Sequence, residues 1–218
     1  MPAQAVRVLS DGEEVGILFE DVPFGEGSIR IERPEDPASL IQDWCNRADP
    51  DVLIPYWAEI WPSSRAIATH LAETGTLEGR TVLDLGCGLG LAGIAAGRLG
   101  ARVTFADNHP DALAFARRNA AAGGLRDPEF LLVDWRAPDW ARPFDLVLGA
   151  DVIYDRSEHE PIAELLNTLL ATGGTAWLGE PNRESAKGFL ADWASRGRCV
   201  KSVRVEDATV HELTLRAR

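Results

Sequence analysis

The sequence predicts an α/β fold in which helices cover both faces of a mainly parallel sheet, with a smaller β-rich extension at the N-terminus. From residue 80 onward, apolar strand-like runs alternate with helical runs, which is typical of a doubly wound sheet. The first run, residues 81–85, breaks into alternating glycines and then continues as a small, apolar helical segment. Residues 1–53 lack this alternation and contain short strand-like segments instead.

The extension is predicted to be a small antiparallel meander followed by a short helix. Residues 6–9, 14–19 and 28–32 alternate apolar and polar side chains and are separated by Gly, Asp and Pro. Residues 38–46 have a helical pattern after a proline-rich break. Because no flexible linker follows, we expect residues 1–53 to pack on a main domain formed by residues 54–218.

An aromatic segment, residues 54–64, joins the two parts. It holds Tyr56, Trp57 and Trp61 between prolines, and Ser63 or Ser64 is expected to cap the helix that follows. The tryptophans are either core anchors of the extension or walls of a site, and residue type alone leaves both interpretations open.

The remaining elements follow the expected alternation. Helical runs after the first strand extend to about residue 99 and then cover residues 110–122, 157–170 and 184–196. Further strands are expected at residues 101–107, 130–133, 144–150 and 175–179, and residues 200–205 and 209–215 form an antiparallel pair.

Composition excludes several classes of protein. The chain has 218 residues, of which 45% are hydrophobic and 26% charged, as in a globular domain with a core. A net charge of −12 argues against a general nucleic-acid-binding surface. No apolar run is long enough to span a bilayer, and no secretory signal is evident, so we expect a cytoplasmic protein, with a monomer favoured. The three cysteines form neither a zinc spacing nor a disulfide framework, and we expect no metal site.

Polar side chains gather at the predicted carboxyl ends of the strands, where open α/β sheets bind ligands. Asp107 and Asn108 end the second strand, Asp134 and Trp135 follow the third, and Asp151 follows the fourth. Glu180 and Arg183 follow the fifth strand, and we expect them at the substrate rim. His70, His159 and His211 show no ligand spacing and are interpreted as ordinary surface or helix residues. Arg117 and Arg118 are interpreted as a solvated helix face.

Two interpretations compete for the glycine turn. Residues 88–93 satisfy the dinucleotide-binding fingerprint, with Asp107 on a ribose hydroxyl, but that assignment gives no role to Asp84 or Gly86. The alternative uses Asp84, Gly86, Gly88 and Gly90 as one unit. In that form, acid-x-Gly-x-Gly-x-Gly, the sequence resembles the class I, seven-stranded S-adenosylmethionine-dependent methyltransferases.

This resemblance covers residues from about 54 to 218 and implies a Rossmann-like sheet with a reversed last strand. It also implies that the glycine loop lies beside the methionine part of S-adenosylmethionine and that Asp107 holds the ribose hydroxyls. An acidic pocket with aromatic walls suits a sulfonium cation. The small side chain of Cys87 is expected to pack inside the loop rather than to react.

A second motif narrows the resemblance. Asp151-Val152-Ile153-Tyr154 has the Asp-x-x-Tyr form of the family-16 protein methyltransferases, many of which modify lysines of specific proteins. Trp61, Trp135 and Ala150 match family positions beside the cofactor. Residues 57–62 and 180–183 most resemble the electron-transfer-flavoprotein β-subunit lysine methyltransferases and their bacterial relatives. The cofactor-binding set is therefore Trp61, Asp84, Gly86, Cys87, Gly88, Gly90, Asp107, Asn108, Asp134, Trp135 and Ala150.

The resemblance implies catalytic roles for Asp151, which would orient the incoming ammonium, and Tyr154, which would shape the pocket. Asp151 could alternatively cap the helix beginning near Ser157. The expected reaction is N-methylation of a lysine side chain on a protein partner. A small-molecule amine N-methyltransferase and a non-catalytic cofactor-binding protein remain alternatives, because fold does not decide the substrate.

Overall fold

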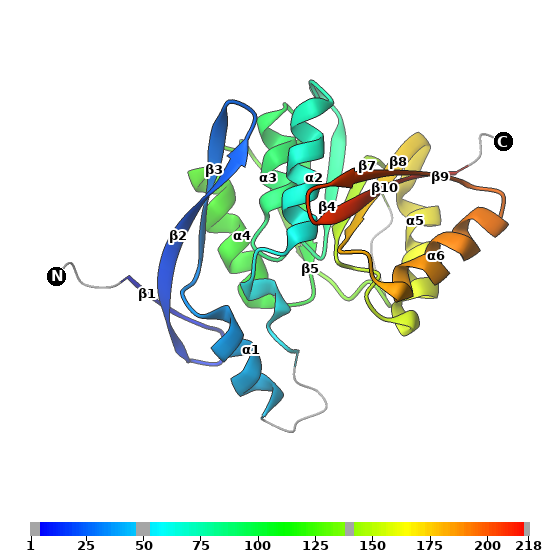
Figure 1. Ribbon diagram of the computed structural model, residues 1–218. Coiled ribbons are helices and arrows are strands. Elements are labelled where there is room, and N and C mark those ends of the chain that lie inside the picture. Colours follow the sequence, from blue (N-terminus) through cyan, green and yellow to red (C-terminus); the bar gives the residue numbers. More distant parts are fainter. Residues whose placement is uncertain (1–4, 47–52, 138–141, 216–218) are drawn as a thin grey trace.

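A seven-stranded sheet forms the centre of the molecule (Figure 1). The computed structural model describes residues 5–46, 53–137 and 142–215. The strands, in chain order, are β4 (Thr81–Leu85), β5 (Arg102–Asp107), β6 (Glu129–Leu132), β7 (Phe144–Ala150), β8 (Leu170–Glu180), β9 (Cys199–Val205) and β10 (Ala208–Thr214).

The order of these strands in the sheet is β6-β5-β4-β7-β8-β10-β9. The first five strands in this order run parallel, whereas β10 is antiparallel to both β8 and β9. The order reverses between β4 and β7, which places a ligand-binding switch point at their carboxyl ends. The predicted fold class, including the reversed last strand, is confirmed.

Helices cover both faces of this sheet, as predicted (Figure 1). On one face lie α2 (Pro62–Glu73), α3 (Leu91–Arg98) and α4 (Pro110–Ala122), and on the other lie α5 (His159–Leu169) and α6 (Glu184–Ser195). Successive strand residues alternate between two hydrophobic cores, so that Val82 packs with the first group and Leu83 with the second. Among the described residues, no helix has the length and apolar character needed to cross a bilayer.

The N-terminal segment forms the predicted antiparallel sheet, β1 (Val6–Val8), β2 (Glu14–Phe24) and β3 (Gly27–Pro34), and then the short helix α1 (Pro37–Cys45). Ile29 and Ile31 of β3 are fully buried and belong to the same core as α2, α3 and α4. Figure 1 shows β3 lying beside α4; β3 also contacts α3, and β2 contacts α2. The extension therefore shares a core with the main domain.

Several boundaries differ from the sequence expectations, among them that of β2, which extends to Phe24 rather than residue 19. β8 begins at Leu170, directly after α5, which is five residues before the expected start at residue 175. The expected serine cap of α2 is wrong, since Pro62 takes the first helical position and Trp61 is the N-cap without a side-chain cap bond. Ser64 instead bonds the Trp61 carbonyl at 2.8 Å, and Ser63 is free to bond elsewhere.

Candidate active site

A cavity of about 510 Å³ opens at the carboxyl ends of β4, β5 and β7. That volume lies in the range of small-molecule sites. Its lining includes eleven of the thirteen residues that the sequence singled out: Trp61, Gly86, Cys87, Gly88, Asp107, Asn108, Asp134, Trp135, Ala150, Asp151 and Tyr154. Asp84 and Gly90 are not among the lining residues.

The glycine loop between β4 and α3 borders the cavity with bare backbone. Gly86 and Gly88 have φ angles of 62° and 51°, which side-chain-bearing residues rarely adopt. A Cβ atom on Gly86 would lie 3.1 Å from both Trp135 and Val152. Glycine is therefore required here by backbone conformation and by the close approach of neighbouring side chains.

Asp84 does not line the cavity, and its carboxylate instead stabilises the glycine loop by bonding the start of α3. Its side chain accepts a hydrogen bond of 2.8 Å from the Gly93 amide in the first turn of α3, and the residue is 2% exposed. Burial raises the pKa of Asp84 to about 8. Asp84 thus ties the strand end to the helix start, and Gly90, whose φ is 86°, forms the N-cap beside Phe105 and Ala116.

Asp107, the last residue of β5, is the acid that borders the cavity beside the glycine loop. Its two oxygens accept the amides of Gly88 and His109, each at 2.9 Å. Burial raises the pKa of Asp107 to about 6, against the lowering effect of these bonds. The Asn108 amide also acts on this carboxylate. Because a carboxylate has about four lone-pair sites, acceptor capacity remains for hydroxyl donors from a ligand. Burial also raises the pKa of the Cys87 thiol well above its ordinary value, which supports packing rather than reactivity.

Asp151 follows β7, which lies on the other side of β4 from the strand β5 that ends in Asp107, so the two acids lie at opposite ends, or poles, of the cavity. The backbone of Asp151 is left-handed, with φ of 58°. Oδ2 accepts the hydroxyl of Ser63 at 2.6 Å, and Oδ1 accepts Arg183 Nε at 3.2 Å and contacts its Nη2 at 3.1 Å. Burial raises the pKa of Asp151, and Ser63 and Arg183 oppose that rise. The alternative that Asp151 caps a helix is wrong, because Asp155 accepts the Ser157 amide there at 2.8 Å.

Three aromatic rings surround the mouth of the cavity near Asp151. The Tyr56 ring lies 6.3 Å from that of Trp61 and 6.5 Å from that of Tyr154, with interplanar angles of 65° and 59°. Trp61 is fixed by a hydrogen bond of 2.8 Å from its indole nitrogen to the Tyr56 carbonyl. The sequence-based site set omitted Tyr56, although its place in the same aromatic segment was the available signal.

The other tryptophans divide between core and cavity. Trp57 is 6% exposed and packs its ring against His109 and Phe115, so it anchors the aromatic segment on α4 while also bordering the cavity. The Trp135 indole nitrogen donates to buried Glu158 at 2.6 Å, which orients the ring beside Gly86.

Several lesser expectations are corrected by the fold. Glu180 is not at the rim: it is 4% exposed and accepts the Arg183 amide at 2.5 Å and pairs with His211 at 3.1 Å. His211 is not a surface residue, because it is buried on β10. His70 is a helix residue, as expected, but it lies on the buried face of α2, where it pairs with Glu212 at 3.0 Å. Neither Ser63 nor the Arg183–Asp151 pair was foreseen, since both contacts depend on tertiary packing.

No group of three or more His, Cys, Asp or Glu side chains within the described ranges is placed to hold a metal ion. The arrangement instead offers a hydroxyl-accepting acid at one pole and a carboxylate with aromatic rings at the other.

Comparison with known proteins gives this geometry a context. A family model described as lysine methyltransferase matches residues 56–193, more than half of the chain. The electron transfer flavoprotein beta subunit lysine methyltransferase of Danio rerio is 36% identical over 132 residues, or 59% of this chain and 51% of that protein. The chain therefore spans about half the length of that relative.

A second relative and a solved structure extend the comparison. The protein N-terminal and lysine N-methyltransferase EFM7 of Eremothecium gossypii is 29% identical over 200 residues, covering 77% of this chain and 76% of that protein. The Thermus thermophilus 16S rRNA N2 G1207 methyltransferase, solved with AdoMet and guanosine, superposes with a TM-score of 0.67 at 16% identity. It covers 94% of this chain and 52% of that one, and it shows the shared fold.

Proposed function

The chain belongs to the lysine methyltransferase family, and on this basis we propose that it transfers a methyl group from S-adenosylmethionine to a lysine side chain of a protein partner. The observation that carries the proposal is one cavity with two poles. Asp107 and the glycine loop lie at one pole, and Asp151, Arg183 and the aromatic rings lie at the other.

The residues present fit the methyl donor. The left-handed backbone at Gly86 and Gly88 lets a ligand approach the loop closely, and a Cβ atom there would be strained. The free lone pairs of Asp107 suit two vicinal hydroxyls in charge-assisted hydrogen bonds. Asn108, Asp134 and Trp135 complete that end of the cavity. When bound, the cofactor supplies an electrophilic methyl group on a sulfonium centre.

The acceptor pole must bring a lysine amine to that methyl group in its neutral form. A free lysine has a pKa near 10.4, so the neutral amine costs about 4.6 kcal/mol at pH 7. Asp151 orients the incoming nitrogen, and Arg183 offsets its negative charge, which keeps the carboxylate from stabilising the ammonium form too strongly. A cation close to the acceptor amine lowers the pKa of that amine, as a desolvated site also does.

Ser63 and the aromatic rings fix the approach of the acceptor. The Ser63 hydroxyl is fully buried and holds Oδ2 of Asp151, so that the carboxylate cannot rotate freely. Tyr56, Trp61 and Tyr154 form apolar walls for the methylene stem of a lysine, and their ring faces attract its ammonium by about 0.5–2 kcal/mol. Transfer requires the nitrogen within about 3–3.5 Å of the methyl carbon.

The test uses the purified chain, methyl-labelled S-adenosylmethionine and a lysate from the organism that encodes it. We expect label in a protein band that yields methyl-lysine on acid hydrolysis. Asp151→Ala and Tyr154→Phe are expected to reduce this labelling while the affinity for S-adenosylhomocysteine, measured by calorimetry, stays nearly unchanged.

The other outcomes separate the alternatives. Label confined to small molecules indicates an amine N-methyltransferase. Binding of S-adenosylhomocysteine without any transfer indicates a non-catalytic binding protein, and the absence of binding by the folded chain contradicts the cofactor assignment. Loss of cofactor binding in Asp151→Ala would contradict the role given to that residue.

A further inference from the structure

We propose that the N-terminal sheet acts as a clamp, meaning that it holds the glycine loop in the conformation that binds S-adenosylmethionine. Asn119 and Glu32 are the positioning residues of this clamp. The identity of the ligand rests on the proposed function. Neither residue lines the cavity. Both residues instead hold the backbone of the glycine loop and the helix α4, which begins at Pro110, three residues after Asp107.

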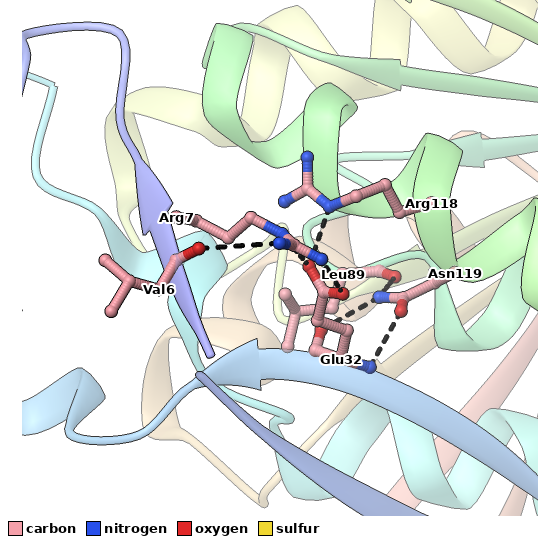
Figure 2. Close-up of polar contacts among 6 residues, drawn as sticks. All are labelled: Val6, Arg7, Glu32, Leu89, Arg118 and Asn119. Carbon is pink, nitrogen blue, oxygen red and sulfur yellow. Dashed lines mark hydrogen bonds and ion pairs between the residues drawn. The ribbon is translucent and has the colours of Figure 1, made fainter. Parts of the chain in front are cut away.

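Asn119, on α4, joins the extension to the glycine loop. Its amide nitrogen donates to the carbonyl oxygens of Leu89 and Glu32, each at 3.0 Å, and its amide oxygen accepts the Glu32 backbone N–H at 2.7 Å. Figure 2 shows this side chain between the β3 backbone and the loop. Asn119 is 1% exposed, and both of its N–H donors and its oxygen are engaged, so its orientation is fixed.

The Glu32 side chain ties the first strand to the same place. Its carboxylate accepts Arg7 Nε and Nη2 at 2.9 and 2.8 Å and Arg118 Nε at 2.7 Å (Figure 2). Burial acts to raise the pKa of Glu32, but the hydrogen bonds from the two arginines outweigh it and hold that pKa below its ordinary value. Glu32 therefore stays ionised and connects β1, β3 and α4.

A second contact fixes the other end of α4. The Ser10 amide and hydroxyl donate to the two carboxylate oxygens of Asp111 at 2.9 and 2.7 Å. Asp111 lies in the first turn of α4, and its own amide donates to His109 at 3.2 Å. The extension thus contacts α4 at two places, at Asp111 near Asp107 and at Asn119 near the glycine loop.

The glycine loop is flexible by composition, so its conformation depends on contacts from outside the loop. Gly88 and Gly90, on either side of Leu89, both have positive φ angles, so the flanking backbone has a wide choice of conformations. The Leu89 carbonyl has the Asn119 amide as a partner, and a carbonyl that loses its partner in a buried place favours rearrangement. Without the clamp, the ligand must select one loop conformation from several, which weakens its binding.

The experiment measures the affinity of the full chain for S-adenosylhomocysteine by calorimetry, together with thermal unfolding. Asn119→Leu removes all three amide contacts at similar volume and is expected to weaken binding by tenfold or more at a temperature where the chain is folded. Glu32→Gln keeps the backbone contacts and loses the charge, so a smaller loss of about threefold is expected. If Asn119→Leu does not fold, the affinity of Glu32→Gln tests the proposal instead.

Leu165→Ala is the matched control. Leu165 is buried in the core on the opposite face of the sheet, so the substitution lowers stability without touching the loop. We expect it to leave the affinity unchanged. If Asn119→Leu and Glu32→Gln lose stability but bind S-adenosylhomocysteine as tightly as Leu165→Ala, the clamp is refuted.

Hydrogen exchange separates this inference from the proposed function. In the ligand-free chain, Asn119→Leu should accelerate exchange of the amides at residues 86–90 more than those of α5. If the wild-type chain does not bind S-adenosylhomocysteine at all, the cofactor assignment fails, and the exchange result alone decides the clamp. Equal acceleration in both regions would refute it.

Discussion

The affinity for the cofactor product should depend on pH through Asp107. Its pKa is raised to about 6 by burial, and its oxygens accept the amides of Gly88 and His109. In the proposed role, only the ionised carboxylate would also accept two ribose hydroxyls. About a quarter of such a carboxylate is ionised at pH 5.5, and nearly all of it at pH 7.5. The affinity for S-adenosylhomocysteine should therefore fall about fourfold as pH falls from 7.5 to 5.5.

Asp107→Asn isolates this effect. The amide keeps an acceptor for the backbone but loses the charge, and a hydrogen bond to a charged group contributes about 1.5–3 kcal/mol. We expect binding about 10- to 100-fold weaker at pH 7.5, by the usual tenfold per 1.4 kcal/mol, and no fourfold pH dependence. Burial lowers the pKa of the neighbouring His109, and the carboxylates that oppose this shift, Asp111 and Asp11, are present in both proteins.

Calorimetry at pH 5.5, 6.5 and 7.5 measures the dissociation constants, and repeating it in two buffers shows whether binding at pH 5.5 releases a proton. Circular dichroism at each pH confirms that the chain is folded. A wild-type affinity that is constant over this range, or an Asp107→Asn variant with the same pH dependence as the wild type, would refute the assignment.

Three further substitutions test the site and its support. Arg183→Met should move the acidic limb of the methyl-transfer rate to higher pH, because Asp151 then stabilises the acceptor ammonium, and the rate at pH 7 falls about tenfold for each pH unit that the limb moves. Asp84→Asn should remove a pH dependence of stability. The pKa of Asp84 is raised to about 8 in the folded chain, so its contribution is present below about pH 4 and is lost as pH rises through 8. Gly93→Ala should destabilise by about 1–3 kcal/mol, since its Cβ would lie 2.3 Å from Phe105 and 2.9 Å from the Asp84 carboxylate.

For Arg183→Met, a rate lowered by the same factor at every pH would indicate a structural role only. Urea unfolding between pH 5.5 and 8.5 tests Asp84→Asn, whose stability should improve relative to the wild type as pH rises; the reverse trend contradicts the argument. Gly188→Ala is the control for Gly93→Ala, because the nearest atom to its Cβ is 4.0 Å away, and it should be neutral or stabilising.

Local sequence patterns predicted the sheet, the helices and the main acids of the cavity. Strand and helix periodicities are local, so the runs around Val82 and Leu165 predict their elements without knowledge of their neighbours. In a parallel sheet the carboxyl ends of the strands share one edge, so Asp107 and Asp151 had to approach the same cavity once the alternation was recognised. The glycine loop was equally readable, because positive φ angles leave a direct mark on residue type.

Tertiary structure decided which partners these residues have. Ser63 reaches Asp151 across 88 residues because the helix begins at Pro62 and turns that hydroxyl inward, and no local pattern encodes this rotation. Asp84 belongs to the loop motif, yet its carboxylate is enclosed under α3 rather than offered to a ligand.

The same holds for Asn119, which has the sequence context of an ordinary helix residue but connects β3 with the Leu89 carbonyl. The physical reason is that a motif fixes residue types along the chain, whereas pairing between distant side chains depends on how helices and sheets pack. Sequence therefore identified the two poles of the cavity, and packing alone decided what holds each pole in place.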